Sequence, residues 1–199
     1  MRSKGEQTMK VLAINGSPRK NGNTQAMIDE AAEGLREGGI KVEKISLADH
    51  DIQPCNGCEA CVRKRWSCPI KDDAIVILRR MVSAHGALIG SPVYYGGVTA
   101  QLKALFDRSV MPYQMHAMKG KVGGAVCVGG GAHGGQELTI MQIATYFFMS
   151  EMIVACSEGG LCGAMAVGND RGDVLKDAEG LRSARYIGNR MAELLRRND

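Results

Sequence analysis

Residues 11–24 are VLAINGSPRKNGNT, a short apolar run followed by a polar segment that contains two glycines. The apolar run, residues 11–14, has the character of a strand that is buried on both faces. Beyond the polar segment, Ile28, Ala31 and Leu35 fall on one face of a helix, and a Gly-Gly pair ends that pattern. A strand, a loop and a helix in this order predict the first unit of an α/β domain with a parallel sheet.

The alternation of strand and helix patterns continues along the chain. Four more strands are predicted at residues 41–47, 87–90, 122–128 and 152–156, and four more helices at residues 73–83, 99–109, 137–149 and 175–196. Five strands separated by helices indicate one doubly wound α/β domain over residues 10–199, preceded by a flexible tail over residues 1–9. The long irregular segment at about residues 48–72 is predicted to be a functional insertion.

The composition is that of an ordinary globular domain, and the sequence argues against a nucleic-acid-binding protein and a membrane-spanning protein. The chain has 199 residues, of which 45% are hydrophobic and 23% are charged. Its net charge of +4 is mild and evenly spread, and only 5% of its residues are aromatic, so nucleic-acid binding is not expected. No apolar run is long enough to span a membrane, and residues 1–8 lack the apolar core of a signal peptide. We therefore expect a cytoplasmic protein.

The polar segment after the first strand has the composition of a phosphate-binding loop. Its position between a strand and a helix places it at the carboxyl edge of the sheet, where ligands of α/β proteins bind. Glycines let backbone N–H groups turn inward, and the start of the helix adds a partial positive charge. The segment lacks the Gly-Lys-Ser/Thr of a nucleoside triphosphatase loop. The candidate ligands are Ser17, Arg19, Asn21, Gly22, Asn23 and Thr24. The alternative is that Asn23 or Thr24 only caps the helix.

Two further glycine-rich loops follow predicted strands. The loop GSPVYYGG, residues 90–97, offers a rigid turn, backbone amides and tyrosine rings that suit an apolar ring system, although the tyrosines could equally be residues at the boundary of the core. The loop GGGAHGG, residues 129–135, contains G-x-G-x-x-G, but it follows the fourth strand rather than the first, which disfavours a dinucleotide site. The candidate residues in these loops are Pro92, Val93, Tyr94, Tyr95, Gly96, Gly130 and Gly131.

The motifs GSPRKNGNT and GSPVYYGG, in this order, resemble the FMN phosphate loop and the flavin-ring loop of the flavodoxin-like NAD(P)H-dependent FMN reductases. The resemblance covers most of the chain from Lys10 onward. It implies a flavodoxin-like sheet with strand order 2-1-3-4-5 and FMN at the switch point between the first and third strands. It also implies that residues 129–135 lie against the pyrimidine side of the flavin, where backbone N–H groups stabilise negative charge.

Four cysteines within the long insertion form the most specific motif of the sequence. Cys55, Cys58, Cys61 and Cys68 are spaced C-x2-C-x2-C-x6-C, and the x2 spacing matches ferredoxin ligation of a 4Fe-4S cluster. Beside an FMN loop, the motif resembles that of the iron-sulfur flavoproteins, a branch of the same reductase family. A structural zinc site and free thiols are the alternatives, although zinc sites usually pair two C-x2-C units across a longer gap.

Other residues receive structural interpretations. Cys127, Cys156 and Cys162 are predicted to be core residues, and Asp72 and Asp73 to cap the helix that follows them. Methionines and aromatic residues within 111–118 and 146–152 exceed what one flavin needs, and they predict a homo-oligomer, either a dimer or a tetramer.

The sequence therefore predicts an FMN-dependent oxidoreductase that transfers electrons between a 4Fe-4S cluster and FMN, without a catalytic acid or base of its own. A redox partner such as ferredoxin, or a small-molecule acceptor, is expected, and NAD(P)H is a possible donor. Three alternatives stay open: an NAD(P)H-dependent FMN or quinone reductase without a cluster, a non-enzymatic electron carrier, and a flavin-binding module with a structural zinc.

Overall fold

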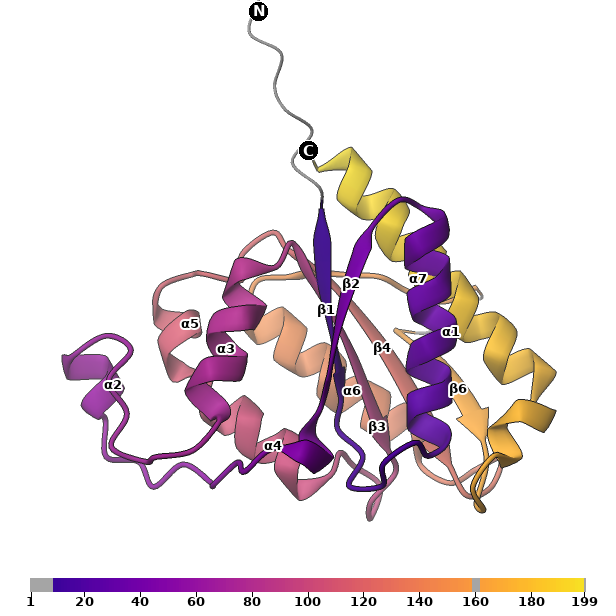
Figure 1. Cartoon of the computed structure of the whole chain (residues 1–199), viewed down its shortest axis with the longest axis horizontal. Coiled ribbons are helices and arrows are strands. Elements are labelled where there is room, and N and C mark those ends of the chain that lie inside the picture. The colour runs from indigo at the N-terminus through magenta and orange to yellow at the C-terminus, as the bar shows by residue number, and fades with distance from the viewer. Residues whose placement is uncertain (1–8, 159–161, 199) are drawn as a thin grey trace, which may run out of the picture.

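A parallel β-sheet runs through the middle of the molecule, with helices on both of its faces (Figure 1). The computed structural model describes residues 9–158 and 162–198. The strands are β1 (Lys10–Asn15), β2 (Lys41–Ser46), β3 (Gly86–Pro92), β4 (Val122–Gly129), β5 (Ile153–Val154) and β6 (Ala164–Val167). Their order is β2-β1-β3-β4-β5, with β6 also paired to β4, and every pairing is parallel. The predicted doubly wound sheet and its strand order are confirmed.

The fifth predicted strand, residues 152–156, is wrong in extent, because the structure divides this edge of the sheet between two short strands. β5 pairs with Val122 and Gly123, and β6 pairs farther along β4, from Val126 to Gly129. The chain returns to the sheet at Gly163, where a Cβ would lie 2.7 Å from the carbonyl oxygen of Ala125. A glycine therefore lets the chain rejoin the same edge, and within residues 9–158 and 162–198 the sheet has six strands instead of the predicted five.

Helices divide between the two faces of the sheet (Figure 1). One face is covered by α1 (Asn23–Glu37) and α7 (Ala178–Arg197), and the other by α3 (Ala74–Ser83), α4 (Ala100–Asp107), α5 (Val110–Gln114) and α6 (Gln136–Met149). Side chains of β1 alternate between the two layers: Leu12 and Ile14 pack on one face, and Val11 and Ala13 on the other. Burial on both faces explains why this strand is a continuous apolar run. None of the helices in the described part of the chain combines the length and apolarity of a membrane span.

The irregular connections differ in detail from the predictions. The insertion contains one turn of 3-10 helix, η1 (Leu47–Asp49), and a short helix, α2 (Ala60–Arg63), which stands apart from the sheet in Figure 1. The last predicted helix begins as a 3-10 helix, η2 (Asp173–Lys176), and α7 starts only after Asp177, whose carboxylate accepts a hydrogen bond from the Gly180 N–H at 2.9 Å. Of the predicted tail, residues 1–8 lie outside the described residues, and Met9 accepts a hydrogen bond from the Lys41 N–H at 3.0 Å.

The methionines and aromatic residues assigned to a subunit surface divide between core and surface. Met115, Met141, Phe148 and Met149 are exposed. Met111, Met118, Tyr146, Phe147 and Met152 are buried. For this second group the surface interpretation was wrong: Tyr146 and Phe147 lie on the inner side of α6, and Met118 and Met152 from the turns beside it join the same core cluster.

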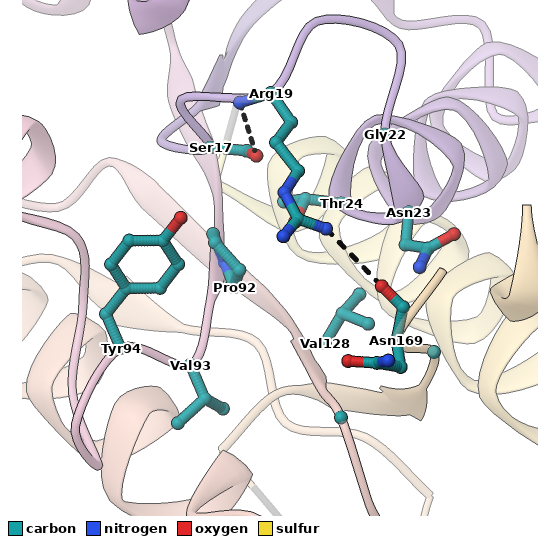
Figure 2. A pocket seen from close by; sticks show the side chains of 12 residues that line it. Ser17, Arg19, Gly22, Asn23, Thr24, Pro92, Val93, Tyr94, Val128 and Asn169 are labelled. Atoms are coloured by element: carbon teal, nitrogen blue, oxygen red, sulfur yellow. Dashed lines mark hydrogen bonds between the residues drawn. The ribbon is translucent and has the colours of Figure 1, made fainter. Parts of the chain in front are cut away.

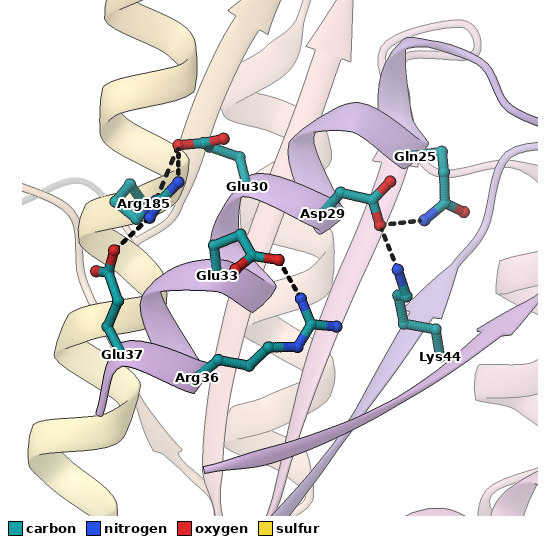
Figure 3. A network of polar contacts seen from close by, with 8 residues as sticks. All are labelled: Gln25, Asp29, Glu30, Glu33, Arg36, Glu37, Lys44 and Arg185. Atoms are coloured by element: carbon teal, nitrogen blue, oxygen red, sulfur yellow. Dashed lines mark hydrogen bonds and ion pairs between the residues drawn. The ribbon is translucent and has the colours of Figure 1, made fainter. Parts of the chain in front are cut away.

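α1 and α7 cross at very short range. A Cβ on Gly188 would lie 2.0 Å from the carbonyl oxygen of Ala31, and one on Gly34 would lie 2.4 Å from that of Arg185. Around this contact, Arg185 of α7 pairs with Glu30 and Glu37 of α1, while Lys44 of β2 reaches Asp29 at 2.8 Å (Figure 3). Glycines thus set the distance between the two helices, and exposed ion pairs surround their contact.

Replacing Gly188 with alanine should destabilise the protein by about 1–3 kcal/mol, because the added methyl group forces the two helices apart. Helix propensity alone would make the alanine variant more stable by about 1 kcal/mol. A loss of stability would therefore identify the packing effect. The measurement is chemical denaturation, with Arg182→Ala on the exposed side of α7 as a control that should stay within about 0.5 kcal/mol of wild type. A Gly188→Ala protein as stable as wild type would contradict the close crossing.

Candidate functional site

The ends of β1 and β3 meet where the chain leaves the sheet toward opposite faces. After β1 the chain enters α1, and after β3 it enters α4 on the other face. The Gly16 N–H donates to the Gly90 carbonyl oxygen at 2.7 Å, and the Thr99 hydroxyl donates to the Gly16 carbonyl oxygen at 2.6 Å. A Cβ on Gly16 would lie 2.9 Å from the Gly90 carbonyl oxygen, so only glycine allows this approach. The divergence of the two segments opens a crevice at the carboxyl edge of the sheet.

A cavity of about 530 Å³, including its open mouth, occupies this crevice (Figure 2). It brings together the loops that follow β1, β3, β4 and β6. Its lining residues are Ser17, Arg19, Gly22, Asn23, Thr24, Pro92, Val93, Tyr94, Val128, Gly130, Gly168 and Asn169. Most of the predicted phosphate and ring residues therefore lie around one space, although they come from loops far apart in the sequence.

One end of the cavity has the groups that bind an anion. Thr24 lies in the first turn of α1, where backbone N–H groups have no partner within the helix, and its side chain is buried. Ser17 is also buried, and its hydroxyl accepts a hydrogen bond from the Arg19 N–H at 3.1 Å. The Arg19 guanidinium lies over this region and donates to the Asn169 carbonyl oxygen at 3.4 Å (Figure 2). Hydroxyls, a cation and a helix N-terminus thus converge where a phosphate would bind.

Gly168 and Asn169, which begin the segment GNDRG at residues 168–172, form a wall of the cavity that sequence reasoning missed. The Asn23 amide donates to the Asp170 carbonyl oxygen at 2.8 Å and accepts from the Gly172 N–H at 2.9 Å. Asn23 therefore binds the segment after β6 and does not cap α1, whose N-cap residue is Gly22 and which has no side-chain cap, so the capping alternative is wrong for Asn23. The available signal was the apolar run AMAV at 164–167 followed by GNDRG, which is a strand and a turn.

The two tyrosines of the loop after β3 have different positions. Tyr94 and Gly97 exchange backbone hydrogen bonds of 2.8 and 3.0 Å, which closes a tight turn with Tyr95 and Gly96 at its centre, both with positive φ. Tyr94 lines the cavity, whereas Tyr95 is fully exposed and lies outside its lining. Of the two candidates, the structure places only Tyr94 where it could contact a bound ring.

The remaining candidate residues shape the loops around the cavity. Asn21 has a φ of 51° in an exposed turn, and its carbonyl oxygen accepts from Arg171 at 3.2 Å. Gly130 lines the cavity, but Gly131 does not, and the carbonyl oxygen of Gly131 accepts from the buried Gln136 side chain at 2.7 Å. Gln136, which the sequence analysis did not single out, thereby holds the loop after β4. Asn21, Tyr95, Gly96 and Gly131 are outside the lining of the cavity.

The four clustered cysteines line a second cavity. Cys55, Cys58, Cys61 and Cys68 surround a space of about 360 Å³, including its mouth, together with the apolar side chains of Ile70, Ile75 and Val110. All four thiols are free. In residues 9–158 and 162–198, no three Cys, His, Asp or Glu side chains are close enough to hold a single metal ion. The four cysteines of the motif thus line one cavity without approaching each other closely enough to hold a single ion, and this cavity shares no lining residue with the first.

A buried ion pair supports the cysteine cavity. The Arg108 guanidinium donates to both carboxylate oxygens of Asp72, at 2.7 and 2.9 Å, and neither side chain is appreciably exposed. Burial acts to raise the pKa of Asp72, but hydrogen bonds from Arg108 and from the Gln53 N–H, together with the charge of Arg108, lower it overall. Asp72 accepts from the Ala74 N–H at 3.2 Å at the start of α3. Asp73 is the N-cap residue, but its side chain makes no cap bond and accepts from the Asp51 N–H at 3.0 Å instead, so side-chain capping by Asp73 was predicted wrongly. The pairing of Asp72 with Arg108 was not visible in the sequence.

The other cysteines lie away from this cavity. Cys127 is fully buried in β4, and burial raises the pKa of its thiol to about 12, which confirms it as a core residue. Cys156 and Cys162 are only half-buried, because they lie where the chain leaves and rejoins the edge of the sheet. Burial raises the pKa of Cys156, and the neighbouring Cys162 contributes to the shift.

Similarity to known proteins extends over nearly the whole chain. The profile of a family described as NADPH-dependent FMN reductase matches residues 9–161. An iron-sulfur flavoprotein of Methanocaldococcus jannaschii is 45% identical over 190 residues, which cover 94% of this chain and 98% of that protein. An iron-sulfur flavoprotein of Methanosarcina thermophila is 42% identical over 147 residues, 73% of this chain and 76% of that protein. The structure of a flavodoxin from the domain Archaea covers 94% of this chain and 99% of that chain, with a TM-score of 0.61 at 19% identity, which shows a shared fold.

Replacing Thr24 with valine tests the anion site, because valine keeps the shape of the buried side chain and removes its hydroxyl. If the hydroxyl bonds a phosphate, the affinity for FMN should fall by about 1.5–3 kcal/mol, which is roughly a tenfold to hundredfold rise in Kd. The measurement is a titration of the apoprotein with FMN, followed by flavin fluorescence. Ser83→Ala removes an exposed hydroxyl at the end of α3 and is expected to leave the Kd unchanged. An unaltered Kd in Thr24→Val would place the phosphate elsewhere.

Proposed function

The chain belongs to the NADPH-dependent FMN reductase family and is a flavin-dependent oxidoreductase, and from this premise we propose that it passes electrons between a 4Fe-4S cluster and FMN. The single observation that carries the proposal is that all four cysteines of the C-x2-C-x2-C-x6-C motif line one cavity. The names of the relatives, iron-sulfur flavoproteins, support the same assignment.

The residues of the first cavity fit FMN. Ser17, Arg19 and Thr24, with the N-terminus of α1, match a single terminal phosphate, while Pro92, Val93 and Tyr94 offer an apolar wall for a ring. FMN supplies both one-electron and two-electron chemistry when it is bound. The part of this chain is to hold the phosphate, orient the ring and direct backbone N–H groups such as that of Gly130 toward it. No acid or base from the chain is required.

The residues of the second cavity fit an iron-sulfur cluster. Thiolates are the usual ligands of such clusters, and four of them surround a space with apolar walls and one buried N–H donor, Arg108. A 4Fe-4S cluster is larger than a single ion and needs its four ligands spread around it. The alternatives are an NAD(P)H-dependent FMN or quinone reductase without a cluster, which the family description favours, and a structural zinc.

A second copy of this chain is the proposed occupant of the outer face of α6. Leu138, Met141, Phe148 and Met149 are exposed on this helix, and the spacing of the first three places them in one stripe. A Cβ on Gly96 would lie 3.7 Å from the Leu138 side chain, so the stripe continues onto the turn that carries the exposed Tyr95. Association through this apolar surface, as a dimer or a tetramer, would also shield the mouth of the flavin cavity.

Redox partners are proposed from charge and position. Arg63, Lys64 and Arg65 are exposed at α2, beside the cysteine cavity, and they suit an acidic electron carrier such as a ferredoxin. NAD(P)H is the proposed alternative donor, which a pyridine-nucleotide oxidation assay would detect, and a small molecule is the alternative acceptor. A cytoplasmic location suits a cluster held by four free thiols, because that compartment keeps cysteines reduced.

Anaerobically reconstituted protein should contain about four irons per chain if the cysteines hold a 4Fe-4S cluster, whereas zinc would give about one metal per chain and no redox-active absorbance. Cys68→Ser should lose the paramagnetic signal of the reduced cluster and keep FMN. Cys156→Ser, outside the cavity, is the matched control and should keep both. Wild-type protein that carries FMN but no iron would overturn the cluster and favour a flavin reductase without one.

Replacing Leu138 with glutamate should shift the protein toward the monomer, because a charge in an apolar interface must be desolvated. Leu175→Glu is the matched control: Leu138 is 62% exposed and Leu175 is 65% exposed, but Leu175 lies in η2, away from α6. The measurement is light scattering at high protein concentration. A wild-type monomer, or an equal effect of both substitutions, would refute the α6 interface.

A further inference from the structure

Arg108 connects three separate points of the cysteine insertion. Its guanidinium donates to the Gln53 carbonyl oxygen at 2.9 Å, to both oxygens of Asp72, and to the Cys68 sulfur at 3.3 Å. The side chain of Arg108 is 2% exposed and that of Asp72 is 0% exposed. The N–H donors of a guanidinium are spread over three nitrogens in one plane and can reach acceptors on different sides, whereas the three N–H donors of a lysine sit on a single nitrogen.

These contacts close the base of the insertion. Gln53 lies just before Cys55, and Asp72 lies shortly after Cys68, so Arg108 holds the segment at both ends. Asp72 also accepts from the Gln53 N–H at 2.8 Å, which joins the two ends directly. Arg108 itself is fixed as the C-cap residue of α4. Arg108 therefore anchors the ends of the cysteine segment to the main body of the domain, while Trp66 packs the middle of the segment against the core.

Cys68 has the greatest need of such an anchor. The other three cysteines follow one another at x2 spacing, while Cys68 returns to the cavity after six intervening residues. The N–H from Arg108 points at its sulfur, which is the atom that would ligate iron. A hydrogen bond to a ligand sulfur stabilises the more negative, reduced state of a cluster and so raises its reduction potential.

We propose, resting on the proposed function above, that Arg108 is a positioning residue which holds Cys68 in the ligand set and raises the reduction potential of the cluster. Arg63, Lys64 and Arg65 are nearer to Cys68 in sequence, but they are exposed, and water and salt screen their charges. Arg108 acts from a buried position, where the interaction is much less screened. Asp72 offsets the charge of Arg108, so the directed N–H, rather than net charge, carries the effect.

The test is a potentiometric titration of the cluster in Arg108→Lys, followed by the paramagnetic signal of the reduced cluster. Lysine keeps the charge beside Asp72, but a single nitrogen replaces the two terminal nitrogens of Arg108, one of which donates to Gln53 and the other to Cys68, so the two bonds are not both kept. We expect the equilibrium constant for one-electron reduction to fall by about tenfold, a shift of about 59 mV toward more negative potential. The FMN potential is the internal reference and should not change, because the two cavities share no lining residue. Arg65→Gln removes an exposed charge and should cause a clearly smaller shift.

A second variant distinguishes a direct effect of Arg108 on the cluster potential from a local packing defect. Asp72→Asn can still accept a hydrogen bond from Arg108 but no longer offsets its charge, so the cluster potential should rise. Opposite shifts in the two variants are not expected from a general loosening of the segment. If Arg108→Lys keeps its fold and FMN but loses iron, the anchoring of Cys68 is supported, and the direction of the Asp72→Asn shift decides the effect on potential.

Iron-loaded Arg108→Lys protein with the wild-type cluster potential would overturn this inference but not the proposed function. A shift of the cluster potential in the same direction in both variants would have the same consequence. Wild-type protein without iron would overturn the proposed function, and this inference with it.

Discussion

The close approach of Gly16 to Gly90 is the constraint on which the rest of the structure depends. It holds the ends of β1 and β3 together at the point where their chains leave for opposite faces of the sheet. Parallel strands need crossover connections, and a crevice opens wherever two neighbouring crossovers go to different sides. The loops after β1 and β3 line this crevice from its two sides. The hydroxyls of one loop and the apolar side chains of the other therefore face a single cavity.

α4 links this crevice to the cysteine cavity. At its start, Thr99 donates to the Gly16 carbonyl oxygen, and at its end Arg108 reaches Asp72 and Cys68. A helix of eight residues is about 12 Å long, so one short element that is buried on its inner side positions a residue at each of the two sites. Burial of the Arg108–Asp72 pair does not by itself imply a gain in stability, because desolvation of two charges is costly. A role in placing Cys68 explains why such a pair lies at the base of an otherwise exposed segment.

The exposed sides of α6 and α1 differ in chemical character. α6 is apolar on its inner side, where Ile143 and Phe147 enter the core, and also on its outer side, where Leu138 and Phe148 are exposed. Glu137, Gln142 and Thr145 are also exposed on the outer side, so its apolar part is a stripe of large side chains, of the kind that marks an interaction surface. By contrast, the exposed side of α1 has ion pairs to α7 and β2 around its contacts (Figure 3). The difference favours α6 rather than α1 as a subunit interface.

The sequence alone predicted the doubly wound α/β class, a candidate phosphate loop and the four-cysteine motif, because each is a pattern within a few consecutive residues. The strand order came from the resemblance to the FMN reductases, and the structure confirms it. Tertiary structure decided what depends on distant segments. It divided the last edge of the sheet between β5 and β6, brought Asn169 to the wall of the cavity, and selected Tyr94 over Tyr95. It also paired Asp72 with Arg108, 36 residues away. Local periodicity specifies which elements form, but the partner of a buried charge is specified only by the packing of the elements against each other.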